Sequence, residues 1–196
     1  MSNVINANIG NFIKEIDSLR NLVRYQTAPR VSSETVAEHS YFVAAYVLKL
    51  HDYLQFDLCK ALKLALLHDF SESFISDVPH PIKQRFPLLN EALDKAENDI
   101  VKEYFSEEFS VWLKEFNECA SAEGITVALA DVLSVVSYAK YEMELGNSKY
   151  MKNVLIRGIA RIYSILEKCE PYLKDGVSLL TLQNHIHCFI DDRTSE

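Results

Sequence analysis

The stretch from residue 57 to residue 72 reads DLCKALKLALLHDFSE. The ten residues before His68 carry only two charges, and Asp57 is of a residue type that often caps the N-terminus of a helix. A helical segment that is apolar on nearly every side is typical of the interior of a protein. The stretch therefore predicts a central, buried helix that runs from about Asp57 to His68 and Asp69.

The segments on either side of this stretch also show helical periodicity. Only five Gly and five Pro interrupt the chain, no segment shows a convincing period of two, and the run Asp77–Pro81 contains two prolines that exclude regular helix there. We predict an all-α single domain, residues 1–196, of about eight or nine helices. The expected helices cover residues 9–23, 34–53, 57–69, 87–104, 107–119, 125–145, 148–169 and 177–190.

The composition is that of a globular chain, with 48% hydrophobic and 24% charged residues. A formal charge of −8 without a basic stripe disfavours binding to a nucleic-acid polymer. Residues 1–6 show no signal-peptide pattern, and we expect no apolar run of the length that spans a bilayer, so no membrane association is expected. The four cysteines form no C-x-x-C pair, and Cys59 and Cys119 fall in segments expected to be buried or half-buried. Isolated reduced thiols in a cytoplasmic protein are the expectation.

His68 and Asp69 end the apolar run, where a charged carboxylate costs several kcal/mol unless it is paired or bound to a metal ion. Taken alone, the dipeptide has an ordinary explanation, namely a histidine that completes the helix dipole and an aspartate that faces water. Glu72 would share their face if the helical path continued for one more turn. Alone it is an exposed glutamate in a polar loop, but beside a His-Asp pair it fits a general acid or base.

Two further polar residues lie in apolar helical segments. His39 lies in ETVAEHS (34–40), where a lone histidine is more often a satisfied core residue. Asp131 is the single carboxylate of VALADVLSVV (127–136), and a metal ion or an arginine would serve equally as its partner. With His68 and Asp69 they supply two imidazoles and two carboxylates from three helices. That set suits a divalent ion such as Mn, Co, Ni, Zn or Fe, with positions left open for water and substrate.

The order His39, His68-Asp69 and Asp131 resembles the H…HD…D signature of the HD phosphohydrolase superfamily. Within it, the chain is similar to the bacterial 5'-deoxynucleotidases of the YfbR-like family. The matching segments, from about residue 24 to residue 145, are Arg24 with its aromatic neighbour, ETVAEHS (34–40), HDFSE (68–72), DVPHPIK (77–83) and Ala130-Asp131. The string H-D-x-x-E-x-x-x-x-D-x-P is far more specific than a bare His-Asp dipeptide.

The resemblance implies an all-helical HD-domain fold, one divalent metal ion (Co, Mn, Ni, Zn, Fe or Mg) and hydrolysis of 2'-deoxyribonucleoside 5'-monophosphates to deoxynucleoside and phosphate. It also implies a homodimer, because relatives are often dimers. The implied metal ligands are His39, His68, Asp69 and Asp131, and the implied acid or base is Glu72. The implied substrate-binding residues are Arg24 at the phosphate, Tyr25 at the base or sugar, Asp77 at the sugar, and Val78, Pro79 and His80 beside it.

Three residues depart from the pattern of the bacterial enzymes. Tyr25 stands where they usually carry Trp, Phe70 replaces a smaller residue, and His80 replaces a small polar one. We expect these positions to lie where the substrate sits, so they bear on its identity. His185 and His187 are set apart from the site, because their side chains would point about 200° apart on a helix and could not chelate one ion together. A surface or packing role is expected for both.

Two alternative functions stay open. A deoxynucleoside triphosphate triphosphohydrolase of the same superfamily would need several additional cations. Arg24, Arg30, Lys83 and Arg85 form no dense cluster, which favours a monophosphate. An inactive interaction protein that keeps the HD scaffold would be expected to have lost ligands, and here the ligand set and Glu72 are all present.

Overall fold

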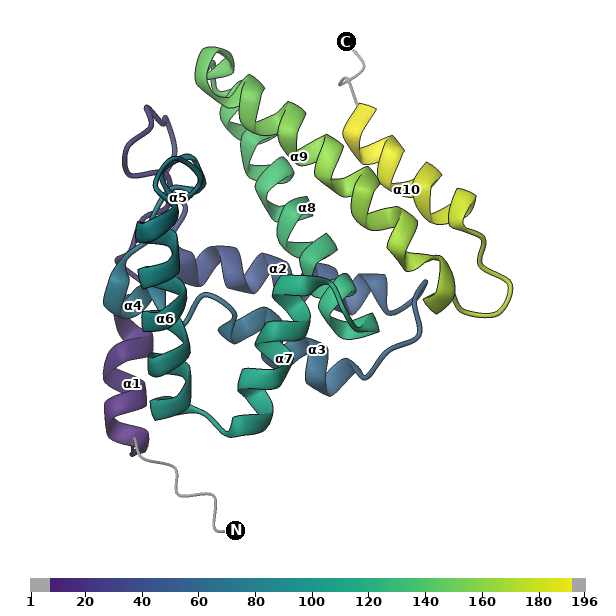
Figure 1. Ribbon diagram of the computed structural model, residues 1–196. Coiled ribbons are helices and arrows are strands. Elements are labelled where there is room, and N and C mark those ends of the chain that lie inside the picture. The colour runs from purple at the N-terminus through teal and green to yellow at the C-terminus, as the bar shows by residue number, and fades with distance from the viewer. Residues whose placement is uncertain (1–7, 192–196) are drawn as a thin grey trace.

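The computed structural model describes residues 8–191, which form ten α-helices, one 3-10 helix and no β-strand (Figure 1). The predicted all-α class is confirmed. The two helices beyond those predicted are the short α4 and α5. In chain order the helices are α1 (Ile9–Ser18), α2 (Val36–Leu50), α3 (Leu58–Leu67), α4 (Glu72–Ile75), α5 (His80–Arg85), α6 (Pro87–Tyr104), α7 (Glu107–Glu118), α8 (Ala122–Glu144), α9 (Ser148–Cys169), η1 (Glu170–Tyr172) and α10 (Leu179–Asp191).

Polar side chains cap the N-termini of α2, α3 and α8. The side chain of Thr35 accepts a hydrogen bond from the backbone N–H of Glu38, whose carboxylate accepts one from the backbone N–H of Thr35. This capping box starts α2. Asp57 caps α3, as predicted, and Ser121 caps α8. Each cap satisfies a free backbone N–H of the first turn and so fixes where the helix begins.

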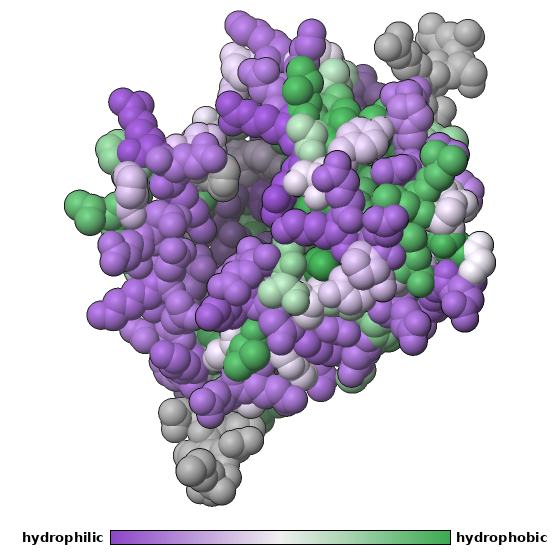
Figure 2. All heavy atoms as spheres, turned by 45° about the vertical axis from the view of Figure 1, so that its right-hand side comes forward, coloured by the Kyte–Doolittle hydropathy of each residue, from purple (hydrophilic) through white to green (hydrophobic). Residues whose placement is uncertain are grey.

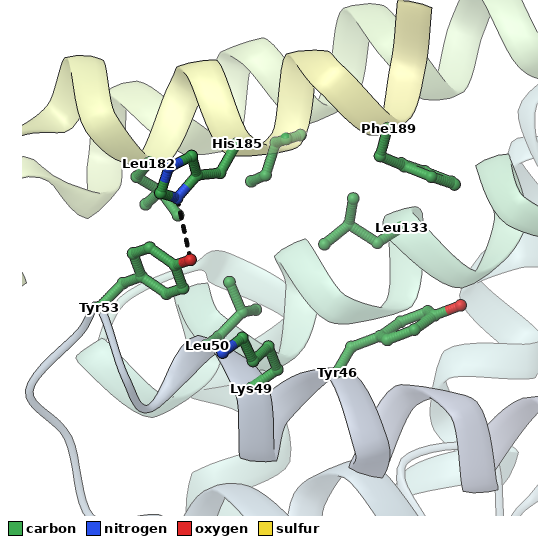
Figure 3. A pocket seen from close by; sticks show the side chains of 9 residues that line it. Tyr46, Lys49, Leu50, Tyr53, Leu133, Leu182, His185 and Phe189 are labelled. Atoms are coloured by element: carbon green, nitrogen blue, oxygen red, sulfur yellow. Dashed lines mark hydrogen bonds between the residues drawn. The ribbon is translucent and has the colours of Figure 1, made fainter. Parts of the chain in front are cut away.

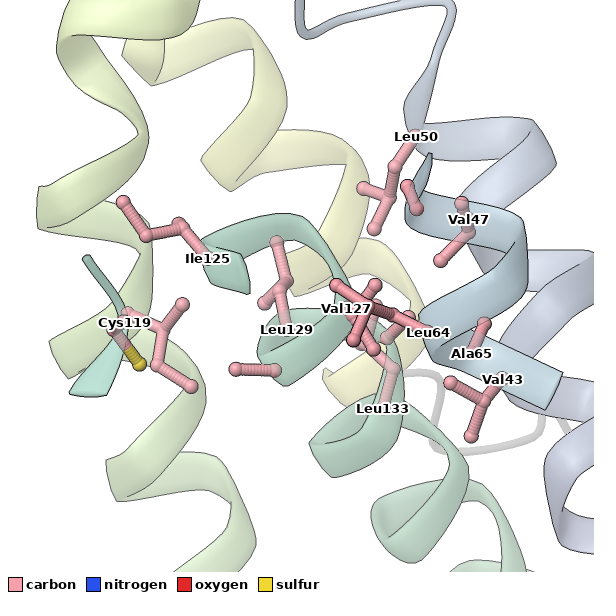
Figure 4. Packing of buried hydrophobic residues seen from close by; sticks show 14 of the residues in the cluster. Val43, Val47, Leu50, Leu64, Ala65, Cys119, Ile125, Val127, Leu129 and Leu133 are labelled. Carbon is pink, nitrogen blue, oxygen red and sulfur yellow. The ribbon is translucent and has the colours of Figure 1, made fainter. Parts of the chain in front are cut away.

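Helix α8 is the centre of the packing. It runs beside α9 and also contacts α2, α3 and α7 (Figure 1). Figure 4 shows apolar side chains of α2, α3 and α8 meeting in one core. Among them are Val43, Val47 and Leu50 from α2, Leu64 and Ala65 from α3, and Ile125, Val127, Leu129 and Leu133 from α8. A close-packed core holds these three helices at fixed separations, so polar residues at its edge keep a fixed geometry.

Two glycines allow α8 to approach its neighbours closely. A Cβ atom on Gly124 would lie 2.5 Å from the backbone oxygen of Glu115 in α7. A Cβ atom on Gly158 of α9 would lie 2.5 Å from Cγ2 of Val136 in α8. Both separations are far shorter than a van der Waals contact, so the helix spacing on two sides of α8 depends on the absence of a side chain.

The predicted first helix is too long, because α1 ends at Ser18 rather than near residue 23. Val23 instead forms an isolated antiparallel bridge with Thr35, and Val36 donates a backbone hydrogen bond to Leu22. These contacts close residues 24–34 into a loop, called the Pro29 loop below. The apolar periodicity up to Val23 therefore reports burial beside α2 and not continuation of the helix.

The exclusion of helix from Asp77–Pro81 is wrong at its end, because α5 begins at His80 with Pro81 in its first turn. The N–H that proline lacks has no partner within the helix at that position, so proline is tolerated there. The prediction of a central, buried third helix holds for only one side of α3. One side of α3 packs into the core, but Cys59, Lys63 and Leu66 are exposed.

The expectation that no apolar run is long enough to cross a bilayer is wrong for α8. By length and composition, this helix has a window of mean hydropathy 1.4 that would suffice. The same window is 61% buried inside the protein, between the helices that α8 contacts. A core helix of a soluble protein meets the same criterion, so the feature is weak evidence for a membrane span.

Candidate metal centre and phosphate site

The four predicted metal ligands come together where α2, α3 and α8 meet. Nε2 of His39 lies 3.1 Å from Oδ1 of Asp131 and 3.7 Å from Oδ2 of Asp69. Nε2 of His68 lies 3.2 Å from the same Asp69 oxygen. Donors bound tetrahedrally to an ion at about 2.1 Å would be about 3.4 Å apart. The observed separations therefore fit ligands that share one ion.

The donor atoms of three of the ligands lie closer to one another than those of all four. One donor atom each of His39, His68 and Asp69 lies within 4.8 Å of the other two, whereas Asp131 joins the group through His39. The two histidine side chains are almost fully buried, while those of Asp69 and Asp131 keep 22% and 29% of their surface exposed. The carboxylates thus form the open side of the centre, which is where water and a substrate would have access.

The second nitrogen of each imidazole has a partner that directs the first toward the centre. Nδ1 of His68 lies 3.1 Å from the backbone oxygen of Ala65, to which it can only donate. Its Nε2 is then free to act as a ligand, as is usual for metal-binding histidines. Nδ1 of His39 lies 3.1 Å from the hydroxyl of Ser134. Both Nε2 atoms are buried without a hydrogen bond, which fits a role as ligands of a cation.

The charges around the centre shift the protonation of these ligands in opposite directions. Burial, helped by the nearby Arg24, lowers the pKa of His39, which favours the neutral form that binds metals. Burial would also lower the pKa of His68, but the carboxylates of Asp69 and Asp131 outweigh it and raise the pKa to about 9. Burial likewise opposes ionisation of Asp69, yet His68 and other cations hold its pKa far below the usual range. The two carboxylates therefore favour a positive charge at the centre, which is a proton on His68 here and which a metal ion would supply in its place.

Glu72 begins α4, one turn beyond the His68-Asp69 pair. Its Oε2 atom is buried and makes no hydrogen bond. Burial raises the pKa of Glu72 to about 9, with the negative charges of Asp69 and Asp77 adding to the effect and Arg24 and His68 opposing it. A carboxyl group that stays close to the ligands, buried and without a partner, has the surroundings of a general acid or base.

Arg24 lies at the start of the Pro29 loop, and its Nη1 atom lies 3.0 Å from the buried carboxylate of Glu34 at the end of that loop. Burial would lower the pKa of Arg24, but Tyr25, Asp69, Glu34 and Asp131 raise it, so the guanidinium stays charged. Sequence reasoning missed the roles of Glu34 and Ser134. Ser134 has a visible signal, because it follows Asp131 by three residues on the same face of α8.

Tyr25 and Asp77, both of which we expect to contact the substrate, lie next to each other. The backbone N–H of Tyr25 donates to Oδ2 of Asp77 across 3.2 Å, and the Tyr25 ring stacks on that of Tyr138 with centroids 5.2 Å apart. Tyr25 has a φ of 57°, a left-handed conformation that is uncommon for a non-glycine residue and often marks functional sites. Figure 2 shows a hollow on this side of the molecule, between the side formed by α5 and α6 and the side formed by α8 and α9.

The other predicted substrate residues differ in outcome. Val78 and Pro79 are half-buried beside Asp77, whereas the side chain of His80 lies outside the part of the chain that the structure describes. Phe70 does not face the substrate, contrary to expectation. It is 1% exposed and packs against Phe12, Tyr104 and Phe105 in an aromatic cluster behind α4. A large side chain at residue 70 therefore fills the core.

A separate pocket of about 280 Å³ lies between α2, α8 and α10 (Figure 3). Its mostly apolar lining includes none of the predicted site residues. At its rim, Nδ1 of His185 lies 2.9 Å from the Tyr53 hydroxyl, while His187 contacts Tyr163 and Asp191. The two histidines thus have different partners, in agreement with separate surface roles.

Comparison with known proteins identifies the family. The family described as 5'-deoxynucleotidase YfbR-like matches residues 11–164. The chain belongs to the YfbR-like family. Among its relatives, the 5'-deoxynucleotidase PM0747 of Pasteurella multocida is 28% identical over 155 residues, which cover 72% of this chain and 79% of that protein. The 5'-deoxynucleotidase HDDC2 of Dictyostelium discoideum is 28% identical over 129 residues, 58% of this chain and 67% of that protein.

Solved structures place this YfbR-like chain in the same fold group. The PH0347 protein of Pyrococcus horikoshii superposes with a TM-score of 0.70 at 27% identity, over 93% of this chain and 98% of that one. An HD-domain phosphohydrolase of Listeria innocua superposes with a TM-score of 0.73 at 20% identity, over 95% of this chain and 90% of that one. The cyanophage S-2L HD phosphohydrolase DatZ, bound to dA and one catalytic Zn²⁺ ion, superposes with a TM-score of 0.59 at 16% identity, over 91% of this chain and 96% of that one. At these last two identities the likeness concerns the fold alone. The resemblance seen in the sequence is confirmed.

Proposed function

We propose that this YfbR-like chain is a metal-dependent phosphohydrolase that cleaves 2'-deoxyribonucleoside 5'-monophosphates to deoxynucleoside and phosphate. The observation that carries the proposal is the meeting of two orphaned imidazole nitrogens, two carboxylates and a buried, unpartnered Glu72 at one place. Family membership supports the same reaction, because the curated relatives carry the name 5'-deoxynucleotidase.

His39, His68, Asp69 and Asp131 would hold one divalent ion, because their donor atoms already have the spacing of a shared ligand shell. When bound, the ion makes a coordinated water more acidic and offers a Lewis-acid contact to a phosphate oxygen. Nitrogen and oxygen donors without a thiolate suit Mn, Co, Ni, Zn, Fe or Mg, and the choice among these ions is left to experiment.

Glu72 handles the proton in this proposal. Its carboxyl group is protonated at neutral pH when no cation is bound, since its pKa is about 9. A positive charge at the adjacent centre would lower that pKa toward neutrality, where one group can both accept and donate a proton. Glu72 would take a proton from the attacking water and return it to the ester oxygen that leaves as the 5'-hydroxyl.

Arg24, Tyr25 and Asp77 would bind the nucleotide. The Arg24 guanidinium lies close enough to the centre for Asp69 and Asp131 to raise its pKa. It would offset charge on the phosphate oxygens. Asp77 has one oxygen on the Tyr25 backbone, which leaves the other to accept a hydrogen bond from the sugar 3'-hydroxyl. Tyr25 would contact the base or sugar, with Val78, Pro79 and His80 beside Asp77.

The monophosphate is favoured over the triphosphate because Arg30 and Lys83, two of the other cations in the motif region, contact other groups of the protein. Arg30 donates to the backbone oxygen of Tyr25 across 3.1 Å, and Lys83 lies 3.4 Å from Glu97. A bound triphosphate would need several cations that are free to approach the β- and γ-phosphates. Arg24 would meet the single phosphate of a monophosphate.

We also propose a cytoplasmic homodimer. All four cysteines are free thiols, which suits a reducing compartment.

The outer face of α2 supports the dimer. It exposes Tyr41, Phe42 and Leu48, with exposed fractions of 65%, 44% and 52%, and three large apolar residues on one helix face are a common feature of subunit contacts. Light scattering on the full chain measures the subunit number.

A phosphate-release screen of nucleoside mono-, di- and triphosphates with several divalent ions tests the proposed activity. We expect dAMP to be hydrolysed faster than AMP, with little turnover of dATP. Arg24→Ala should slow all phosphate substrates alike, whereas Asp77→Ala should reduce the preference for dAMP over AMP. Faster hydrolysis of dATP with release of triphosphate would replace the proposal by the triphosphohydrolase alternative.

A further inference from the structure

Glu142 is a fully buried carboxylate on α8 that the mechanism above does not use. Its Oε2 atom accepts hydrogen bonds from the backbone N–H of Val31 across 2.8 Å and from the side-chain amide of Asn147 across 2.7 Å. Its Oε1 atom accepts one from the backbone N–H of Ser32 across 2.5 Å. A buried charge is stable only when it is satisfied in this way, so the three donors and the carboxylate fix one another.

Two further side chains join the same loop to the same region. Nδ2 of Asn147 also donates to the backbone oxygen of Pro29 across 2.9 Å. The hydroxyl of Tyr138 donates to the backbone oxygen of Ser32 across 2.9 Å, and its ring stacks on Tyr25. Three positions of the Pro29 loop, residues 29, 31 and 32, are thus held by hydrogen bonds to Glu142, Asn147 and Tyr138. We call Glu142 and Asn147 with these contacts the Glu142 clamp.

The loop that the clamp holds also carries substrate residues. Arg24 and Tyr25 lie where the chain enters the loop, and Glu34, the partner of Arg24, lies where it leaves. Asp131 and Glu142 are eleven residues apart, close to three full turns, so they share a face of α8 about 16 Å apart along its axis. One rigid helix therefore contacts the metal centre at one point and the Pro29 loop at another.

We propose that Glu142 is a positioning residue that ties the Pro29 loop to α8 and so holds Arg24 and Tyr25 at a fixed place beside the metal centre. The role given to Arg24 rests on the proposed function. The attachment of the loop to α8 does not rest on it. Glu142 itself touches neither the substrate nor the metal ligands.

Glu142→Gln is the sharpest variant because it preserves shape. If the new NH₂ group replaces Oε1, it faces the N–H of Ser32, which is also a donor. If it replaces Oε2, it faces two donors, the N–H of Val31 and the amide of Asn147. One arm of the clamp must therefore break. Glu144→Gln is the matched control, with the same change of charge two residues away on the same helix at an exposed position. Asn147→Ala is a milder second variant, which removes the link to Pro29 and leaves the two backbone donors on Glu142.

Hydrogen exchange at the amides of Val31 and Ser32 measures the attachment directly. We expect roughly tenfold faster exchange or more at these two amides in Glu142→Gln, a smaller rise in Asn147→Ala, and no change in Glu144→Gln. If Glu142→Gln fails to fold, Asn147→Ala decides the matter alone. Unchanged exchange at both amides in a folded variant would overturn the proposal.

Steady-state kinetics on dAMP test the consequence for the site. We expect kcat/KM to fall roughly tenfold in Glu142→Gln with unchanged metal content, because small displacements of a binding group cost this much or more. In an Arg24→Ala background the same substitution should lower kcat/KM by clearly less than tenfold, since one of the two groups that it positions is already gone. A full additional tenfold loss there would overturn the link to Arg24. If the wild-type chain hydrolyses no nucleotide, the proposed function fails, and hydrogen exchange still decides the attachment of the loop.

Discussion

At the scale of single residues, Glu72 gives the most direct test of the chemistry. Glu72→Gln keeps the size of the side chain and removes its capacity to exchange a proton, so we expect turnover to fall by roughly two orders of magnitude or more. Metal content and melting temperature should stay close to those of the wild-type chain, because Glu72 is not among the ligands and its buried Oε2 has no partner to lose.

The matched control is Glu91→Gln, an exposed position on α6. Both variants should be assayed with saturating metal so that a change in affinity for the ion does not count as a change in chemistry. Near wild-type turnover by Glu72→Gln would show that Glu72 is an ordinary polar residue in the first turn of α4.

The metal ligands were predictable from sequence because together they follow the H…HD…D order, although each of them taken alone has an ordinary explanation. Their roles stay predictions until a metal is measured. Glu34 was not predictable in the same way, since its pairing with Arg24 depends on how the Pro29 loop returns to its own start. For Ser134, Tyr138 and Glu142, the spacing from Asp131 shows a shared face of α8, but only the packing shows what that face touches.

At the scale of helices, the contact between α8 and α9 at Gly158 should not tolerate a side chain. In Gly158→Ala the new methyl group would meet Val136 at 2.5 Å, so one helix must move or Val136 must leave its rotamer. We expect a loss of about 1–3 kcal/mol in the free energy of unfolding, measured by urea denaturation, in spite of the higher helix propensity of alanine.

Val136→Ala in the same chain provides the control, because it removes the methyl group that Gly158→Ala would strike. The double variant should be less destabilised than the sum of the two single variants. Strict additivity would show that the two positions do not touch.

The long helices α6 to α9 were recognisable from periodicity alone, whereas the early end of α1 and the short α5 depend on local contacts that periodicity does not report.

At the scale of the whole molecule, the centre lies where three helices from distant parts of the chain meet. His39 comes from α2, His68 and Asp69 follow the last turn of α3, and Asp131 comes from the middle of α8. Sequence predicts that these residues belong together but not that their donor atoms lie 3.1 to 3.7 Å apart, because that distance is set by the packing of the core between the helices. A cation bound there would tie all three helices to one point.

Metal binding should therefore stabilise the entire fold. A ligand that binds only the folded state at a hundred times its dissociation constant adds about 2.7 kcal/mol, which for a chain of this size raises the melting temperature by roughly 5–10 °C. We expect that rise when Mn²⁺, Co²⁺ or Zn²⁺ is added to chelator-treated protein, and its loss when the chelator returns. Asp131→Ala should bind about one ion per chain less and show little of the rise, whereas Asp175→Ala, an exposed aspartate beyond η1, should behave as the wild type. An equal rise in melting temperature and unchanged metal content in Asp131→Ala would place the ion elsewhere, since the proposed site brings α8 to the metal through that one carboxylate.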